Sequence, residues 1–315
     1  MVFSKLASKR ATLDVLSSFG LYTKHRLGQN FLIDDSVIGH ILELARVQAD
    51  DYVIEIGPGI GTLSCALLPR VKRLCAIEAD HVLPDVLAET LGEYADKFEL
   101  ISADALKVSA DEIRTKLFSA DCAGNACSVK LIANLPYQIA ATAVLRYLEM
   151  LPELNELIVM VQSEVAQRMA AQPAHKLYGA YSAKLALYAE CVGGFKVAPS
   201  NFFPSPHVMS EVIHIQRRTA DKQLCKAHER AYVARVIDAA FSQRRKTLLN
   251  CLCACGFDKQ DVLKACDNLH IDVHERGEKL TPAQFVELAR VLGSVSAQTS
   301  TLPCNFDEKK RDEHI

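Results

Sequence analysis

Between positions 50 and 162, hydrophobic residues form five short runs that are apolar on both faces. Helical patterns separate these runs, and two further strands are expected nearer the C-terminus. Strands covered by helices on both sides have this composition, and their alternation with helices favours a parallel sheet with right-handed crossovers. We therefore predict an α/β domain with a mainly parallel seven-stranded sheet, its strands at Tyr52–Ile56, 74–79, 98–103, 129–133, 157–161, 194–198 and 211–216.

The pattern changes after Arg218. Residues 227–295 have only helical periodicity, and Thr281 and Pro282 suit the N-cap and first position of a helix over 283–291. We predict a small all-helical domain here, followed by a polar, disordered tail. The expected division is α/β domain 31–218, helical domain 219–295 and tail 296–315, with a basic segment 1–30 in front.

Composition places this 315-residue chain among ordinary globular proteins, since half of its residues are hydrophobic. It has no apolar run of about 18 residues, so no membrane association is expected. The basic, acid-poor start lacks the apolar core of a secretory signal, although it also fits a short organellar transit segment. The net charge of −2 does not indicate a nucleic-acid binder. Three local basic patches could bind a polyanion, and the alternative is that each is only a solvated basic face. These patches are 1–30, Arg217–Arg218 and Arg244–Lys246.

The eleven cysteines are an odd number without the spacing of a disulfide framework. Cys251, Cys253 and Cys255 cannot all lie on one side of a helix. A metal site there is possible, but buried apolar thiols are favoured, and no metal is assigned. A reducing cytoplasm fits best.

Three consecutive predicted strands end in residues suited to a nucleoside ligand. After the first comes EIGPGIG, whose Gly57 and Gly59 let a ligand approach the backbone. At the end of the second, Glu78 can accept hydrogen bonds from both hydroxyls of a ribose, and after the third Asp104 can accept from an adenine amine. A structural glycine turn with a surface glutamate is the alternative. Because no phosphate-binding lysine follows the glycines, the combination points to S-adenosylmethionine rather than a nucleoside triphosphate.

The fourth strand ends in Asn134-Leu135-Pro136-Tyr137 at the same edge. This stretch resembles the target-base loop of amino-group methyltransferases. An adenine N6 amine is a poor nucleophile because its lone pair is delocalised. The Asn134 amide oxygen and the Leu135 carbonyl could accept its two hydrogens and aim the nitrogen at the methyl group, while Tyr137 offers a ring for stacking. No strong general base is needed.

The block KHRLGQNFL at 24–32 extends the resemblance to the whole chain. With EIGPGIG, IEAD, SADAL, NLPYQI, VQSEVAQRM, YGAYSAKL, APSNFFPSPHVMSEV, FSQRRKTLLN and RGEKLTPAQF, it resembles the ribosomal RNA adenine N6,N6-dimethyltransferase family over about 21–292. The resemblance implies a Rossmann-like class I methyltransferase domain. It also implies dimethylation of two adjacent adenosines in the 3′-terminal hairpin loop of small-subunit rRNA. The expected partner is a pre-ribosomal small subunit, and the expected product of the donor is S-adenosylhomocysteine.

Functional residues follow from the matching motifs, with segment 1–30 expected to fold over the donor. The resemblance places donor contacts at Gln29, Asn30, Leu32, Gly57, Gly59, Glu78, Asp104 and Asn134, and target-base contacts at Asn134, Leu135, Tyr137 and Phe202. A buried aromatic under a loop is the alternative for Phe202. Arg244, Arg245 and Lys246 are expected to open or lie on a helix and to contact rRNA phosphates; the alternative is that they bridge the two domains. Departures from the family pattern are Gln138, Ala198 and the run 207–210.

Other functions stay open at this point. The related large-subunit rRNA methyltransferases that confer macrolide resistance share the donor site but usually have NIPY. A ribosome-assembly or mitochondrial transcription factor with dispensable catalysis is a second alternative. An NAD-dependent enzyme is a third, and it lacks a residue suited to hydride transfer. We expect a monomeric, cytoplasmic enzyme of small-subunit biogenesis.

Overall fold

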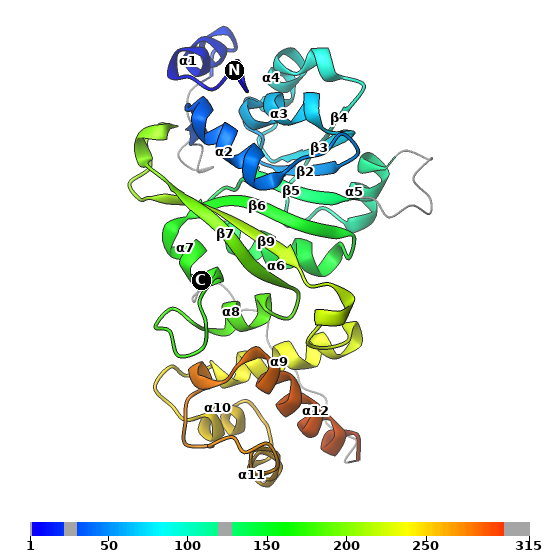
Figure 1. The fold of residues 1–315 in the computed structure, drawn as a ribbon, viewed down its shortest axis with the longest axis vertical. Helices are drawn as coiled ribbons and strands as arrows, with labels where there is room; N and C mark the ends of the chain where they lie inside the picture. The colour runs from blue at the N-terminus through cyan, green and yellow to red at the C-terminus, as the bar shows by residue number, and fades with distance from the viewer. Residues whose placement is uncertain (1, 22–29, 119–127, 299–315) are drawn as a thin grey trace. The chain divides into compact units, whose positions relative to one another are not determined.

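The computed structural model describes residues 2–21, 30–118 and 128–298, which divide into two compact units between Gln223 and Leu224. The first unit contains one large sheet and its covering helices, and the second is helical (Figure 1). The boundary lies five residues after the position expected from the sequence, because a short 3₁₀ turn at Ala220–Lys222 still belongs to the first unit.

The large sheet has seven strands in the order β4-β3-β2-β5-β6-β9-β7. The five strands from β2 to β6 are parallel, and β9 is antiparallel to both of its neighbours. The predicted mainly parallel seven-stranded sheet is therefore confirmed. The strands are β2 Tyr52–Ile56, β3 Arg73–Glu78, β4 Phe98–Ser102, β5 Val129–Asn134, β6 Leu154–Gln162, β7 Ala189–Val197 and β9 Ser210–Arg217. A separate two-stranded sheet pairs β1 Phe31–Leu32 with β8 Phe202–Phe203.

Two hydrophobic clusters cover the two faces of the large sheet. Along β2, Ile54 and Ile56 belong to one cluster, while Val53 between them belongs to the other. This alternation explains why the strands are apolar at every position. Helices α5, α6, α7 and α8 contribute to the first cluster, and α2, α3 and α4 to the second (Figure 1). Their bounds are α2 Asp35–Ala45, α3 Thr62–Leu67, α4 Leu83–Thr90, α5 Ala110–Leu117, α6 Ala140–Met150, α7 Ser163–Met169 and α8 Ala180–Leu185.

The N-terminal helix α1 (Lys9–Ser18) belongs to the first unit. The backbone N–H groups of Phe3 and Ser4 donate to the carboxylate of Asp35, in the first turn of α2. Leu16 packs in a small cluster with Phe31, Ile60, Leu83 and Val86. Residues 2–21 are therefore a folded part of this unit.

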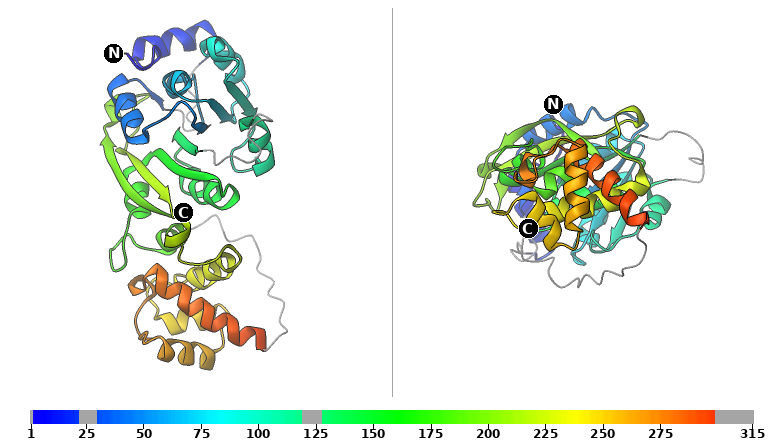
Figure 2. Two further views of the ribbon diagram at one scale, coloured as in Figure 1. Left: turned by 45° about the vertical axis from the view of Figure 1, so that its right-hand side comes forward. Right: turned by 90° about the horizontal axis from the view of Figure 1, so that it is seen from below.

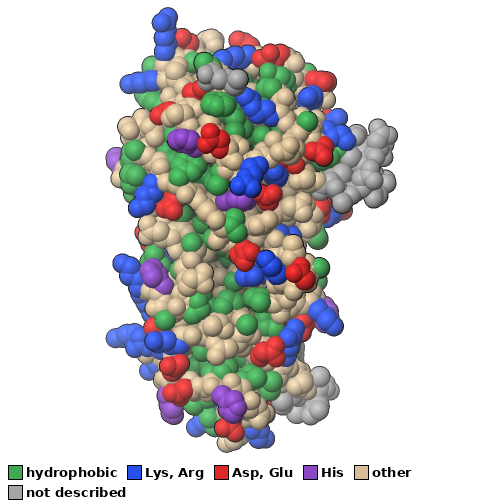
Figure 3. Space-filling model, viewed as in Figure 1, with side chains coloured by type: hydrophobic (Ala, Val, Ile, Leu, Met, Phe, Trp, Pro, Cys, Tyr) green, Lys and Arg blue, Asp and Glu red, His purple; other side chains and the backbone are tan. Residues whose placement is uncertain are grey.

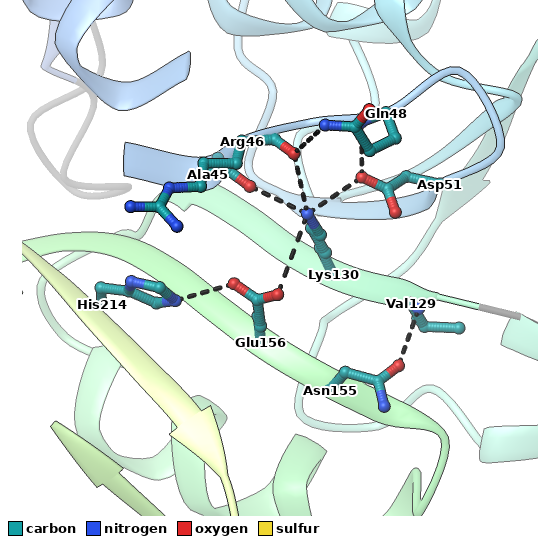
Figure 4. Close-up of polar contacts among 9 residues, drawn as sticks. All are labelled: Ala45, Arg46, Gln48, Asp51, Val129, Lys130, Asn155, Glu156 and His214. Atoms are coloured by element: carbon teal, nitrogen blue, oxygen red, sulfur yellow. Dashed lines mark hydrogen bonds and ion pairs between the residues drawn. The ribbon is translucent and has the colours of Figure 1, made fainter. Parts of the chain in front are cut away.

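A buried ammonium group joins the end of α2 to the sheet (Figure 4). Lys130 on β5 is only 4% exposed, and its Nζ lies 3.0 Å from the carboxylate of Asp51, which is 2% exposed. The same Nζ donates to the carbonyls of Ala45 and Arg46 at 2.9 and 3.3 Å. These carbonyls have no partner within the helix because α2 ends there, with Arg46 left-handed at φ 45°.

The polar contacts continue along β6. Glu156 lies 3.9 Å from Lys130, and its other oxygen is 2.8 Å from Nε2 of His214 on β9. Hydrogen bonding to His214 and the nearby Lys130 ammonium lower the pKa of the Glu156 carboxyl. Asp51, Lys130 and Glu156 thus lie at or just before the beginnings of β2, β5 and β6, opposite the carboxyl ends of these strands, and His214 of β9 lies beside them (Figure 4).

The second unit consists of four α-helices and short 3₁₀ turns among its described residues. They are α9 Arg230–Ala240, α10 Leu248–Ala254, α11 Lys259–Asn268 and α12 Pro282–Gln298. Helix α12 packs against α9 and α11 (Figure 2). It begins as predicted: Oγ1 of Thr281 accepts from the N–H of Gln284, whose side chain accepts from the N–H of Thr281. It runs seven residues beyond the predicted end, so the first three residues of the expected tail are helical; the others lie outside the described residues.

The remaining short helices are 3₁₀ turns, at Leu68–Arg70, Gly92–Tyr94, Pro199–Asn201, Ala227–Glu229 and Gly277–Lys279. No helix in the described ranges is long and apolar enough to span a membrane.

Candidate active site

A cavity of about 320 Å³ opens at the carboxyl ends of the parallel strands. Residues at or just after the ends of β2, β3, β4 and β5 form its wall, together with β1. The open ends of neighbouring parallel strands are where α/β proteins bind ligands. The lining includes nine of the predicted site residues, Asn30, Leu32, Gly57, Gly59, Glu78, Asp104, Asn134, Leu135 and Tyr137.

The glycine turn after β2 lies in the cavity wall and has a left-handed backbone at two positions. Gly57 and Gly59 have φ angles of 70° and 60°, which residues with a Cβ atom rarely adopt. A Cβ on Gly59 would lie 3.0 Å from the ring of Phe31, and one on Gly57 would lie 3.2 Å from Pro136. The backbone at Gly57 and Gly59 is therefore open to a ligand, because these two residues have no side chains.

Glu78 ends β3 with its carboxylate in the cavity wall. The residue is 8% exposed. Its Oε1 accepts from the N–H of Asp80 at 2.9 Å, and Oε2 accepts from the N–H of Gly59 at 3.3 Å. Burial raises the pKa of the carboxyl, and these two hydrogen bonds partly oppose the shift. A desolvated carboxylate with spare lone pairs is suited to accept hydrogen bonds from a hydroxylated ligand.

Asp104 follows β4 and is half-buried in the same wall. One carboxylate oxygen accepts from the N–H of Leu106 at 2.9 Å, and the other lies 3.7 Å from the exposed ammonium of Lys107. The turn that follows the strand therefore orients Asp104 toward the cavity.

Asn134 at the end of β5 contacts the N-terminal part of the unit. Its amide nitrogen donates to the carbonyl of Asn30 at 3.1 Å. This bond orients the carboxamide, and no hydrogen bond from the described part of the chain engages Oδ1. Asn30 and Leu32 both line the cavity. Gln29, the other predicted donor contact of this segment, lies outside the described residues.

The loop after Asn134 places Leu135, Pro136 and Tyr137 in the cavity wall. Leu135 is 1% exposed, and its N–H donates to the carbonyl of Met160 on the neighbouring strand. The ring of Tyr137 is half-buried in the cavity wall, and its phenol oxygen lies 2.7 Å from Oγ of the fully buried Ser210. Burial raises the pKa of this phenol. The hydrogen bond fixes the ring while leaving it beside the cavity.

Phe202, which was expected to contact the target base, lies in the core, as its alternative of a buried aromatic under a loop has it. Phe202 is 2% exposed, belongs to the core cluster under α2 and does not line the cavity. Its strand β8 pairs with β1, and successive side chains of a strand point to opposite faces. The partly exposed aromatic is therefore its neighbour Phe203.

Two polar residues of the cavity wall were missed by the sequence reasoning. Glu55 on β2 lines the cavity, is 2% exposed and accepts from the hydroxyl of Ser64 at 2.6 Å. Burial raises the pKa of its carboxyl to about 8, with a smaller contribution from the charge of Glu78. Thr62 also lines the cavity, and its buried hydroxyl has no hydrogen-bond partner among the residues that the structure describes. Both flank the glycines of EIGPGIG, and their side-chain types alone do not indicate a place in a cavity wall.

The basic triplet Arg244–Lys246 does not lie on a helix. It occupies the connection between α9 and α10, where all three side chains are exposed. On the face seen in Figure 3, basic and acidic side chains are interspersed. The other pair, Arg217 and Arg218, is used inside the first unit. Arg217 donates to three carbonyls at and beyond the end of α6, and Arg218 donates to the carbonyl of Ala186.

Cys251 and Cys253 lie on α10, and Cys255 is its C-cap. Cys251 is buried, while Cys253 and Cys255 are intermediate in exposure. The described ranges contain no group of three or more His, Cys, Asp or Glu side chains that could hold a metal ion.

The cavity fits S-adenosylmethionine. The bare backbone of the glycine turn can lie against the ligand, a buried carboxylate follows on the next strand, and a second carboxylate follows on the third. With the mainly parallel seven-stranded sheet, these features define a class I S-adenosylmethionine-dependent methyltransferase.

The particular family follows from comparison with known proteins. The sequence model of the family described as "Ribosomal RNA adenine dimethylase" matches residues 20–293. The chain is 37% identical over 292 residues to "Ribosomal RNA small subunit methyltransferase A" of Clostridioides difficile (strain 630), a match that covers 92% of this chain and 98% of the relative. The protein therefore belongs to the ribosomal RNA adenine dimethylase family.

Solved structures agree with the fold. A dimethyladenosine transferase from Plasmodium falciparum has a TM-score of 0.66 at 23% identity, covering 82% of this chain and 95% of that one. The 23S rRNA methyltransferase ErmE has a TM-score of 0.62 at 21% identity, covering 84% and 100%.

Proposed function

We propose that this protein transfers methyl groups from S-adenosylmethionine to N6 of two adjacent adenosines in the 3′-terminal hairpin loop of small-subunit rRNA. The substrate would be a pre-ribosomal small subunit, and the enzyme would act as a cytoplasmic monomer in small-subunit biogenesis. The name of the similar Clostridioides protein supports the choice of subunit. The observation that supports the chemistry best is the oriented carboxamide of Asn134 beside the donor cavity.

Donor binding is assigned to the cavity wall. Glu78 would accept hydrogen bonds from the two ribose hydroxyls, Asp104 would accept from the adenine amine, and Gly57 and Gly59 would let the donor lie against the backbone. Asn30, Leu32 and the undescribed Gln29 would close the N-terminal side. The packing of Leu16 on α1 against Phe31 supports a role for residues 1–30 in covering the donor, because Phe31 lines the cavity.

When bound, S-adenosylmethionine supplies an electrophilic methyl group on a sulfonium ion. The chain's own residues position the nucleophile. Oδ1 of Asn134 would accept a hydrogen bond from one N–H of the adenine amine, and the backbone carbonyl of Leu135 would accept from the other. The orientation of this carbonyl is restricted because Leu135 precedes Pro136. Both bonds direct the nitrogen lone pair toward the methyl group, and Tyr137 would stack on the extruded base.

The same pair of acceptors allows a second methylation. A monomethylated amine retains one N–H, which Asn134 or Leu135 can still accept. The methylated nitrogen loses its proton easily to solvent, so the cavity wall needs no strong base. Dimethylation therefore requires that S-adenosylhomocysteine be exchanged for a second S-adenosylmethionine and that the monomethylated base occupy the cavity again.

We assign phosphate contacts to Arg244, Arg245 and Lys246, whose exposure leaves them accessible to a polyanion. Replacing all three by Gln should weaken rRNA binding and flatten its salt dependence, because fewer counterions are released. A lower melting temperature with an unchanged salt slope would instead indicate a structural role.

The deciding experiment is a methylation assay with unmodified small subunits and labelled S-adenosylmethionine. Mass spectrometry of nuclease fragments should find dimethyladenosine at both adjacent positions, and Asn134→Ala should abolish the product while leaving binding of the small subunit nearly intact. Labelling of protein-free large-subunit rRNA with untouched small subunits would overturn the substrate and leave the reaction type.

A further inference from the structure

Segment 203–210 lies beside the cavity, and both of its ends are fixed to the cavity wall. At its start, Phe203 is the strand partner of Phe31, which lines the cavity. At its end, the hydroxyl of Ser210 lies 2.7 Å from the phenol oxygen of Tyr137, another lining residue. A nucleic acid whose base enters the cavity therefore lies close to this segment.

The side chains that this segment presents to solvent include several large apolar groups. Val208 is 44% exposed and Met209 is 41% exposed. Phe203 is partly exposed because the pairing of β8 with β1 turns Phe202 into the core. Neighbouring exposed apolar groups of this kind are typical of interaction sites, since covering them with a ligand is favourable.

A basic side chain lies over the aromatic ring of this segment. The ammonium of Lys9 on α1 is 5.3 Å from the ring centroid of Phe203, and Lys9 is exposed. Proteins bind single-stranded nucleic acid with this combination, because a base stacks on the ring and the cation attracts the adjoining phosphate. Helix α1 lies outside the residues that the family model matches.

We propose that Phe203 and Lys9 form a stacking subsite for the nucleotide next to the target adenosine. This inference rests on the proposed RNA substrate. Extruding one base removes a stacking partner from its neighbour, and the ring of Phe203 supplies a replacement surface. In a loop with two adjacent adenosines, the adenosine outside the cavity is such a neighbour.

The first test measures RNA affinity in the presence of S-adenosylhomocysteine. The probe is a labelled RNA hairpin with two adjacent adenosines in its loop. Phe203→Leu keeps an apolar side chain but removes the stacking face, and it should weaken binding about 5- to 150-fold, the range for loss of one base–aromatic stack. Phe203→Tyr should bind like the wild type. Lys9→Gln should weaken binding more than Arg10→Gln, the matched control one position along α1.

The second test asks whether the ring and the neighbouring base interact. Hairpins with an abasic site on the 5′ or 3′ side of the target adenosine are titrated against the wild type and Phe203→Leu. On one side of the target adenosine, the affinity lost through the abasic site and the affinity lost through Phe203→Leu should be non-additive, with a coupling of at least about 5-fold. On the other side the two losses should add. Additive losses on both sides, with unchanged melting temperature and donor affinity, overturn the subsite.

The two proposals fail differently. If the wild type methylates small subunits but the losses are additive, the subsite is wrong and the proposed function stands. If the coupling is present but small subunits are not methylated, the subsite stands and the substrate assignment is wrong.

Discussion

Replacing Glu78 by Gln tests the donor site most directly, because the substitution preserves the shape of the side chain, removes its charge and replaces one acceptor oxygen by an NH2 donor. Both oxygens of the carboxylate already accept a backbone N–H, at 2.9 and 3.3 Å. A glutamine has one acceptor oxygen, so it cannot retain both of these bonds and also accept from two ribose hydroxyls.

The magnitude follows from the hydrogen bonds. A bond to a charged group contributes about 1.5–3 kcal/mol, against about 0.5–1.5 for a neutral one. Weakening two bonds to the donor should therefore cost about 2–3 kcal/mol, or roughly 30- to 150-fold in affinity.

Calorimetric titration with S-adenosylhomocysteine measures this loss, and the pH dependence supplies a second readout. Burial raises the pKa of Glu78 in the free protein, while bound hydroxyls favour its ionised form. Wild-type affinity should therefore fall as the pH decreases through that raised pKa, and the affinity of Glu78→Gln should stay flat over the same interval.

Glu99→Gln is the matched control. Glu99 lies on the adjacent strand β4, pairs with Arg73 and Lys116, and does not line the cavity. Its substitution should leave donor affinity unchanged. If a folded Glu78→Gln variant bound within about threefold of the wild type, or kept the same pH slope, Glu78 would not hold the ribose.

Three other predictions concern the same unit. Tyr137→Phe should retain most methyl transfer, because the stacking face remains, with a stability cost of about 1–2 kcal/mol for the unpaired Ser210 hydroxyl, whereas Tyr137→Ala should lose activity; similar turnover in both would exclude stacking. Lys130→Met should lower the unfolding free energy in urea by about 3–5 kcal/mol by leaving the Asp51 carboxylate buried and unpaired, and adding Asp51→Asn should recover part of it; a loss below about 1 kcal/mol would mean that the pair is weak. The pKa of Glu55 is raised to about 8 in the folded state, so the stability that this carboxyl contributes is lost as the pH rises from its pKa in the unfolded chain through about 8. In Glu55→Gln, the free energy of unfolding measured in urea should therefore depend less on pH over that interval, and an unchanged dependence would contradict the assignment.

The sequence alone determined the sheet and most of the site. Strands such as Tyr52–Ile56 are apolar on both faces because helices cover both sides, and this property can be read without coordinates. Gly57, Glu78, Asp104 and Asn134 could likewise be assigned to one cavity. The carboxyl ends of neighbouring parallel strands necessarily meet at one edge of a sheet.

Only the tertiary structure decided which way individual side chains face. Phe202 is in the core and Phe203 reaches solvent because the two residues of β8 pair with β1 in a register that no local pattern specifies. Lys130 is buried in an apolar strand because its partners come from positions 45, 46, 51 and 156, which only folding brings together. Facing, burial and charge pairing depend on contacts between distant segments, so local sequence leaves them open.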